Sequence, residues 1–148
     1  MPRSSDSNSQ DESISPSVTC EMLPKVLIAD DSRFQRQMLA SCLPPKKFEI
    51  IFAVDALQTW MMALRSTPDL ILLDINMPGG TGIEVLKRLR VSNKTQQIPV
   101  IVVSGDEHPT TEALARELGA LDFLHKPVDQ QELVDAVDRV FGIHSNAS

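Results

Sequence analysis

The chain has 148 residues and a net charge of −6, with 20 acidic and 14 basic side chains, a length that favours one domain. Acidic proteins without a long basic stripe are poor ligands for the nucleic-acid backbone, so we expect no direct nucleic-acid binding. No apolar run approaches the roughly 18 residues needed to span a bilayer, and no signal peptide is visible, so a soluble cytoplasmic protein without a membrane anchor is expected. The two cysteines, Cys20 and Cys42, lack the spacing of a disulfide framework or a zinc site.

Residues 1–23 are rich in Ser, Asp and Asn and have too little apolar content to offset the entropy of ordering, so we predict a disordered N-terminal tail. From residue 24 onward, short β-branched runs alternate with longer amphipathic stretches, which is typical of repeated βα units. Strands are expected at 25–29, 49–54, 69–73, 98–103 and 122–125, and helices at 32–43, 56–66, 83–91, 111–118 and 130–141. The pattern predicts one α/β domain over 24–142, followed by a short tail at 143–148.

Several of the predicted helices carry start and stop signals. Capping boxes pair Asp55 with Gln58, Thr81 with Glu84, and Asp129 with Glu132, and Gly119 and Gly142 stand where helices should end.

One apolar stripe runs along the predicted helix 56–66. Leu57, Trp60, Met61 and Leu64 follow the i, i+3, i+4, i+7 spacing of a single helix face. We interpret this stripe as core packing against the sheet in preference to a partner or cofactor site.

Polar side chains of complementary chemistry follow four predicted strands. Asp30 and Asp31 come after the first strand, Asp74 after the third, Ser104 after the fourth and Lys126 after the fifth. In an open parallel sheet the carboxyl ends of the strands meet at one edge, where ligands usually bind. Taken singly, these residues also fit a helix cap, a turn, a loop hydroxyl bonded to its own backbone, and a solvated surface lysine. Four such strand ends together favour a shared site.

Electrostatics indicates what such a site requires. Two carboxylates about 5 Å apart repel by roughly 3 kcal/mol at an effective dielectric constant near 20, which would raise one pKa by about two units. A divalent cation relieves this repulsion, and hard oxygen ligands favour Mg²⁺ or Mn²⁺ over zinc. The cation and Lys126 would then neutralise an incoming phosphoryl group while an oxygen of Asp74 attacks phosphorus.

Four segments, VLIADDS, LILLDINMPGGTGIEVLKRLR, IPVIVVSG and ELGALDFLHKPV, occur in an order and spacing that resembles the receiver domains of two-component response regulators, including the single-domain chemotaxis regulator. The resemblance runs from Lys25 to Gly142. It implies a doubly wound, flavodoxin-like fold with a five-stranded parallel sheet of strand order 2-1-3-4-5.

The same resemblance implies roles at the metal site. Asp30 and Asp31 look like the acid pair that holds Mg²⁺, with Asp31 a direct ligand and Asp30 acting largely through water. Asp74 looks like the phosphoacceptor and a further ligand. The backbone carbonyl of Asn76 completes the implied protein ligands.

The resemblance also implies a switch. Ser104, in place of the more frequent threonine, looks like the hydroxyl that turns toward the phosphoryl group, and Lys126 looks like the lysine that pairs with it. Phe123, where many members have tyrosine, corresponds to the switch aromatic that moves from outward to inward on activation. The peptide bond before Pro127 is expected to be cis. Gly105 after the switch serine leaves Asp74 open to attack.

The implied function is a signalling domain that accepts a phosphoryl group from a histidine kinase or a histidine phosphotransfer protein. It promotes its own phosphorylation and dephosphorylation but is not a turnover enzyme. A downstream effector is expected on the face formed by helix 111–118, the strand at Phe123 and helix 130–141. We further hypothesise that Asn76 and Asp106, two residues past the acceptor and the switch serine, orient attacking water and give a short-lived phosphoryl group.

The first predicted helix poses a choice. Leu39 and Leu43 are expected to face the sheet, whereas Phe34 and Met38 form an i, i+4 pair turned partly away. We slightly prefer a core position for this pair over a docking surface for the kinase.

Other functions stay open at this point. The chain could keep the fold as a phosphorylation-independent interaction module, or be the receiver part of a larger regulator. A magnesium-dependent phosphatase with an aspartyl nucleophile would need a second acid after Asp74, where Ile75 and Asn76 stand. A flavin-binding protein is disfavoured because the strand-end acids would repel the flavin phosphate.

Overall fold

The computed structural model describes residues 23–77, 80–106 and 108–142, so the predicted tails at 1–23 and 143–148 lie almost entirely outside the described residues. Its centre is a five-stranded parallel sheet in the order β2-β1-β3-β6-β7. These strands are β1 (Lys25–Ala29), β2 (Glu49–Ala53), β3 (Leu70–Leu73), β6 (Val100–Ser104) and β7 (Asp122–His125). The expected order 2-1-3-4-5 is confirmed: β4 (Asn76–Met77) and β5 (Gly80–Thr81) lie outside this sheet, so β6 and β7 are its fourth and fifth strands.

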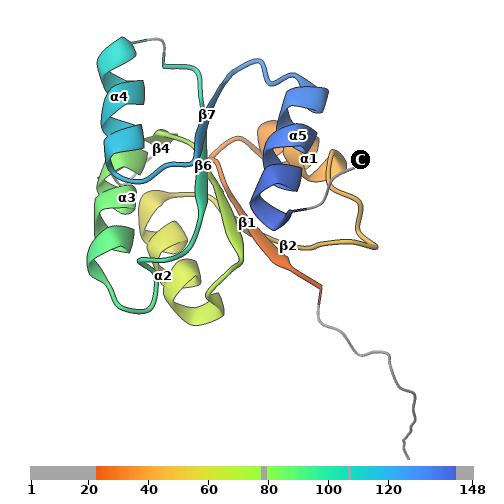
Figure 1. The fold of residues 1–148 in the computed structure, drawn as a ribbon, viewed down its shortest axis with the longest axis horizontal. Coiled ribbons are helices and arrows are strands. Elements are labelled where there is room, and N and C mark those ends of the chain that lie inside the picture. The colour runs from red at the N-terminus through yellow and green to blue at the C-terminus, as the bar shows by residue number, and fades with distance from the viewer. Residues whose placement is uncertain (1–22, 78–79, 107, 143–148) are drawn as a thin grey trace, which may run out of the picture.

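Within the described residues four helices connect the strands, a fifth follows the last strand, and together they cover both faces of the sheet (Figure 1). They are α1 (Arg33–Ser41), α2 (Ala56–Ser66), α3 (Gly82–Val91), α4 (Pro109–Glu117) and α5 (Gln130–Phe141). Successive side chains of the strands point to opposite faces of the sheet, and each face has its own apolar core. One core joins Leu27 and Ile71 to side chains of α2, α3 and α4, and the other joins Ile28 and Leu72 to side chains of α1 and α5.

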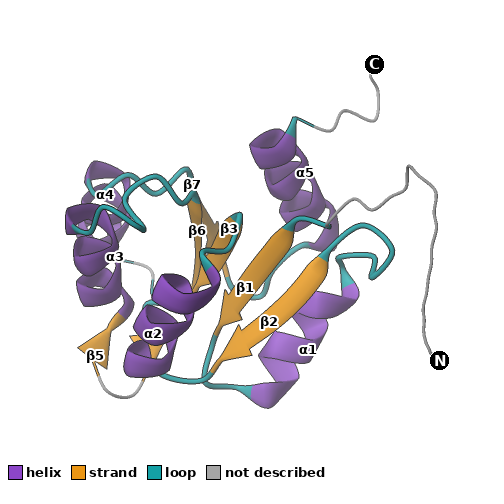
Figure 2. Cartoon of the chain, turned by 90° about the horizontal axis from the view of Figure 1, so that it is seen from below, coloured by secondary structure: helices purple, strands orange, loops and turns teal. Residues whose placement is uncertain are grey.

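The predicted boundaries hold closely. The bounds of β1, β7, α2 and α5 are as expected, and the other elements begin or end within two residues of their prediction. The caps predicted at Asp55, Thr81 and Asp129 accept hydrogen bonds from Gln58, Glu84 and Glu132 backbone N–H groups. The two short strands β4 and β5 form an antiparallel ribbon between β3 and α3, where no strand was predicted. Figure 2 shows β5 set apart from the main sheet.

The prediction that the apolar stripe of α2 packs in the core is wrong for two of its four residues. Leu57 and Met61 are 60% and 40% exposed, whereas Trp60 packs partly against the core. The fully buried side chains of α2 are small ones, at Ala56, Thr59 and Ala63. Apolar residues occur all around this helix, so periodicity alone cannot select the buried face, and the close approach of the helix to the sheet favours the small side chains.

The preferred core position of Phe34 is also wrong. Leu39 and Leu43 are buried as predicted, but Phe34 is 76% exposed. Five residues of α-helix separate Phe34 from Leu39 by about 140° around the axis, so the two cannot share a face.

Among the described residues, none of the helices has the length and apolar character that a membrane span requires.

Candidate functional site

Three charged side chains meet at the carboxyl edge of the sheet. Asp30 and Asp74, directly after β1 and β3, are only 1% and 3% exposed. The Nζ atom of Lys126, directly after β7, lies 2.9 Å from Asp30 Oδ2 and 3.4 Å from Asp74 Oδ2. The predicted convergence of these strand ends is therefore present in the fold.

The carboxylates of Asp30 and Asp74 are oriented by the same pattern of local hydrogen bonds. Asp30 donates its N–H to the Ala53 carbonyl, and Asp74 donates its N–H to the Ala29 carbonyl, which extends the sheet by one residue at each strand. The Oδ1 atom of Asp30 accepts a hydrogen bond from Ser32 N at 2.9 Å, and Oδ1 of Asp74 accepts one from Asn76 N at 3.1 Å. The other oxygen of each carboxylate is left to face Lys126.

Burial and charge shift the protonation of this cluster. Burial raises the pKa of Asp74, although the hydrogen bond from the Asn76 backbone and the charge of Lys126 oppose the rise. Burial alone would lower the pKa of Lys126, but the hydrogen bond with Asp30 and the charge of Asp74 outweigh it, so that pKa is raised. Lys126 therefore carries a positive charge between two carboxylates at neutral pH.

The acids also form a group suited to a hard cation. One carboxylate oxygen from each of Asp30, Asp31 and Asp74 lies within 4.8 Å of the others. Asp31 is exposed, and it is Ser32 that caps α1 by accepting a hydrogen bond from Gln35 N at 3.2 Å. Asp31 therefore needs no capping role, and its carboxylate can serve the cluster. Three carboxylate oxygens, one of them from an exposed residue, match the oxygen coordination that Mg²⁺ prefers.

The predicted switch serine is fully buried and bonded locally. Ser104 Oγ accepts a hydrogen bond from Asp106 N at 3.0 Å, which is the local backbone bond considered above for a loop hydroxyl. Its carbonyl accepts from Lys126 N at 2.9 Å, which joins the ends of β6 and β7.

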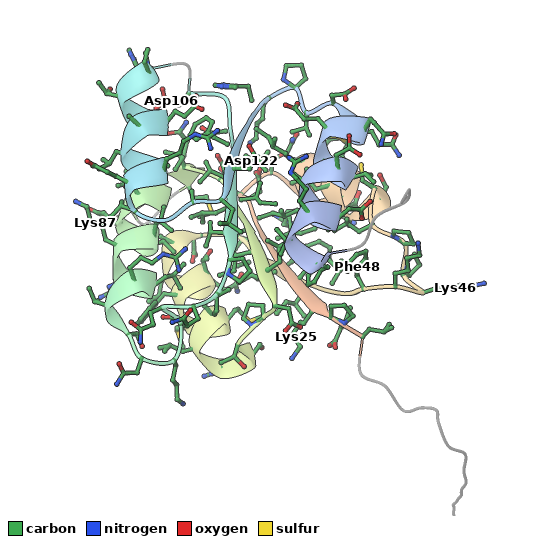
Figure 3. All side chains as sticks on the ribbon, viewed as in Figure 1. Lys25, Lys46, Phe48, Lys87, Asp106 and Asp122 are labelled. Carbon is green, nitrogen blue, oxygen red and sulfur yellow. The ribbon has the colours of Figure 1, made fainter. Side chains whose placement is uncertain are left out.

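Asp106 is tied to the start of α4 (Figure 3). Its carboxylate accepts hydrogen bonds from His108 N at 2.9 Å and Thr111 Oγ1 at 3.0 Å. These two bonds lower the pKa of Asp106. His108, the residue before α4, makes no side-chain cap bond, and Asp106 instead holds the start of the helix through the His108 N–H and the Thr111 hydroxyl.

The remaining predicted residues lie on or just after β7. Phe123 is buried in the core on the α2–α4 side of the sheet, with its ring centroid 5.0 Å from that of His125. The aromatic ring is thus in the inward position in this structure. The peptide bond between Lys126 and Pro127 is cis, as expected.

Two residues near the acids were not singled out by the sequence. Arg36 Nη1 donates a hydrogen bond to the backbone carbonyl of Asp30 at 2.8 Å. Gly82, the first residue of α3, donates its N–H to the Ile75 carbonyl at 2.7 Å. The spacing of six residues between Asp30 and Arg36 was visible, but only the fold shows that the arginine turns back onto the strand end.

An open parallel sheet with helices on both faces and charged side chains at its carboxyl edge defines a doubly wound α/β protein. The family model described as the response regulator receiver domain matches residues 26–138, and the chain belongs to this family. Receiver domains act in two-component signalling and are not turnover enzymes in the usual sense.

Individual relatives agree with this assignment. The chain is 34% identical to sporulation initiation phosphotransferase F of Bacillus subtilis, over 84% of this chain and 99% of that protein. It is 37% identical to two-component response regulator ORR11 of Oryza sativa, over 79% of this chain and 80% of that protein. It also matches protein RcaC of Microchaete diplosiphon at 35% identity, but covers only 18% of that longer protein.

Solved structures share the fold. Chemotaxis response regulator CheY4 of Vibrio cholerae superposes with a TM-score of 0.73 at 29% identity, covering 80% of this chain and 99% of that one. A response regulator from Chloroflexus aurantiacus gives a TM-score of 0.76 at 26% identity, covering 82% and 99% of the two chains.

Proposed function

We propose that Asp74 accepts a phosphoryl group from a phosphohistidine on a partner kinase or phosphotransfer protein, and that the ordered unit over 24–142 then changes a protein-binding surface. The observation that carries this proposal is the buried Asp74 carboxylate, held by Asn76 N on one oxygen and facing the Lys126 ammonium with the other. A buried nucleophile beside a fixed positive charge is suited to receive an anionic group.

The transfer is an in-line displacement at phosphorus. A carboxylate oxygen of Asp74 forms the new O–P bond while the P–N bond to the donor imidazole breaks, and the electron pair of that bond stays on the imidazole nitrogen. Lys126 lies 3.4 Å from Asp74 and offsets negative charge on the phosphoryl oxygens. Catalysis here consists mainly of positioning and charge neutralisation, so the domain promotes its own modification without turning over a substrate.

The acids fit a resident divalent cation. Asp30, Asp31 and Asp74 would hold Mg²⁺, or Mn²⁺ in its place, because their oxygens already lie within 4.8 Å of one another. The backbone carbonyl of Asn76 is the fourth protein ligand in this proposal. When bound, the cation would offset the combined charge of the carboxylates and the phosphoryl group.

The switch begins at Ser104. A phosphoryl group on Asp74 brings new acceptor oxygens, which favour a hydroxyl that donates to them over one that accepts from Asp106 N. Turning Ser104 would break its bond to Asp106, and Asp106 holds the first turn of α4 through Thr111. The proposed path thus runs from Asp74 through Ser104 and Asp106 to Thr111 at the start of α4.

The surface that would respond is the face of α4, β7 and α5. Asp122 of β7 joins both helices there, with Arg139 Nη2 at 2.8 Å and Arg116 Nη2 at 3.6 Å from its carboxylate oxygens (Figure 3). Movement of α4 would shift Arg116 relative to Asp122 and so change the charges that a partner meets. A downstream effector protein is the proposed occupant of this face.

Phosphoryl lifetime belongs to the same proposal. Asn76 is exposed beside Asp74 and is free to orient attacking water. Asp106 can do so only after giving up its bonds to His108 and Thr111. The lifetime is therefore coupled to the state of α4.

Phosphorylation by a small donor tests the proposal directly. Purified protein is incubated with Mg²⁺ and acetyl phosphate, and intact mass is recorded. The wild type and an Asp135→Asn control, altered on the exposed side of α5, should both gain one phosphoryl group, and Asp74→Asn should gain none. Equal labelling of Asp74→Asn would place the acceptor elsewhere. Absence of wild-type labelling with any donor would favour a phosphorylation-independent interaction module.

A further inference from the structure

Arg36 satisfies a buried carbonyl at the point where β1 leaves the sheet. The strand pairing of β1 with both β2 and β3 ends at Ala29, so the carbonyl of Asp30 has no partner in the ladder. Asp30 is almost fully buried, and a buried carbonyl without a hydrogen bond is costly. Arg36 Nη1 supplies that bond at 2.8 Å from the second turn of α1.

This bond fixes a peptide plane that carries both acids of the pair. The Asp30 carbonyl and the Asp31 N–H belong to one rigid peptide unit, so holding the carbonyl also sets the direction in which Asp31 leaves the chain. The Asp30 side chain is held separately, by Ser32 N and Lys126. Asp31 is exposed, so this peptide plane is an important constraint on where its carboxylate lies.

We propose that Arg36 is a positioning residue for divalent-cation binding: by holding the Asp30 carbonyl it keeps Asp31 directed toward Asp74. The inference rests on the proposed function, because it assigns to Arg36 a task in the same cation site. Outer-shell hydrogen bonds of this kind commonly change metal affinity by about 10- to 100-fold when they are removed.

The direction of the change in Mg²⁺ affinity distinguishes a positioning role of Arg36 from a purely electrostatic one. A guanidinium near a cation site repels the cation, so losing only its charge should tighten Mg²⁺ binding. Losing the hydrogen bond should instead weaken Mg²⁺ binding, because Asp31 is no longer held toward the other acids. Arg33 offers a matched control, since it lies on the same helix, carries the same charge and is exposed.

The experiment measures Mg²⁺ affinity by calorimetry for Arg36→Gln, Arg36→Lys and Arg33→Gln, beside the wild type. Arg36→Gln should bind about tenfold more weakly, at the lower end of the usual range. Arg36→Lys should stay within about threefold of the wild type, because a single donor reaching one carbonyl does not require the guanidinium fork. Arg33→Gln should bind as the wild type does, or slightly more tightly.

A second readout guards against a merely structural effect. Hydrogen exchange of the Asp31 and Ser32 amides should accelerate in Arg36→Gln, while the β3 and β6 amides keep their protection. If Arg36→Gln does not fold, Arg36→Met, which keeps an aliphatic stem but has no donor, is compared with Arg33→Met, and only Arg36→Met should lose Mg²⁺ affinity.

Specific outcomes overturn the inference. Unchanged or tighter Mg²⁺ binding by Arg36→Gln contradicts it, and so does an equal loss in Arg33→Gln. In the fallback comparison, equal affinities of the two methionine variants contradict it. A wild type that binds no Mg²⁺ would instead overturn the proposed cation site itself, so the two failures are distinct.

Discussion

Gly82 packs directly against the backbone of Asp74. A methyl group on its Cα would overlap the Asp74 carbonyl oxygen and would stand 2.7 Å from Ile75 Cα. The first residue of α3 thus rests on the loop that carries the proposed acceptor, and the Gly82 N–H bond to the Ile75 carbonyl holds the two together. Only a residue without a side chain allows this close approach.

Substitution of Gly82 by alanine should therefore disturb the acceptor loop. The added methyl group meets backbone atoms that cannot rotate away, and we expect a loss of about 1–3 kcal/mol in the free energy of unfolding. Labelling by acetyl phosphate should slow in parallel, because Asp74 shifts. Urea unfolding and intact mass measure the two effects. For stability, Gly105→Ala is the control, since its Cβ meets no atom of the described structure within 4 Å, and an equal loss of stability at the two positions would contradict the packing argument.

Thr111→Val should shorten the life of the phosphoryl group. Valine keeps the shape of threonine but removes the hydroxyl that donates to Asp106 Oδ2, which leaves that carboxylate freer to orient water. We expect dephosphorylation to accelerate a few-fold, in line with the loss of a hydrogen bond worth about 1 kcal/mol. Decay of the labelled protein, followed by mass, measures the rate.

Two further variants complete that test. Asp106→Ala should slow the decay, because it removes the carboxylate altogether. The exposed Thr110 lies beside Thr111, and Thr110→Val should leave the rate unchanged. If Thr111→Val and Asp106→Ala both decay like the wild type, Asp106 has no part in setting the lifetime.

Asp74→Asn should stabilise the protein at neutral pH in the absence of divalent cations. The raised pKa of Asp74 means that the folded state binds its proton more tightly than the unfolded chain does. Ionised Asp74 therefore lowers stability above that pKa, and the contribution disappears as the pH falls through it. An uncharged amide avoids this loss.

Urea unfolding in EDTA across a pH series measures the difference. The midpoint of Asp74→Asn should exceed that of the wild type at neutral pH, and the gap should narrow at acid pH, where Asp74 takes up its proton. Adding Mg²⁺ should raise the wild-type midpoint more than that of the variant. A gap that does not change with pH would mean that ionisation of Asp74 is not its cause.

Phe34→Ala should slow phosphotransfer from the kinase without weakening the fold. The ring is largely exposed, so its removal should change the free energy of unfolding by less than about 0.5 kcal/mol. If Phe34 contributes to docking, transfer should slow by about tenfold, as for a contact worth 1–2 kcal/mol, while labelling by acetyl phosphate is unaffected. Equal loss with both donors would point to the site itself. Leu39→Ala, at a buried position of the same helix, should cost about 2–5 kcal/mol and serves as the contrast.

The sequence by itself determined the order of strands and helices along the chain and the strand ends at which the charged side chains stand, whereas the sheet order was implied by the resemblance to a known family. The continuous apolar runs of β3 and β6 are typical of strands covered on both faces, and parallel strands place Asp30, Asp74 and Lys126 at one edge. These inferences depend on local periodicity and on which residue follows each strand, and both can be read along the chain.

Only the tertiary structure decided which side chains face inward on the helices and which atoms the polar groups bind. Leu57 and Met61 satisfied a helical pattern yet lie exposed, because the depth of packing against the sheet, and not spacing alone, selects the buried face of α2. Arg36 reaches Asp30, and Asp106 reaches Thr111, through hydrogen bonds set by the path of the connecting loops. A periodic pattern specifies an element and its direction, whereas a hydrogen bond depends on distances of a few tenths of an ångström that arise only when the elements pack together.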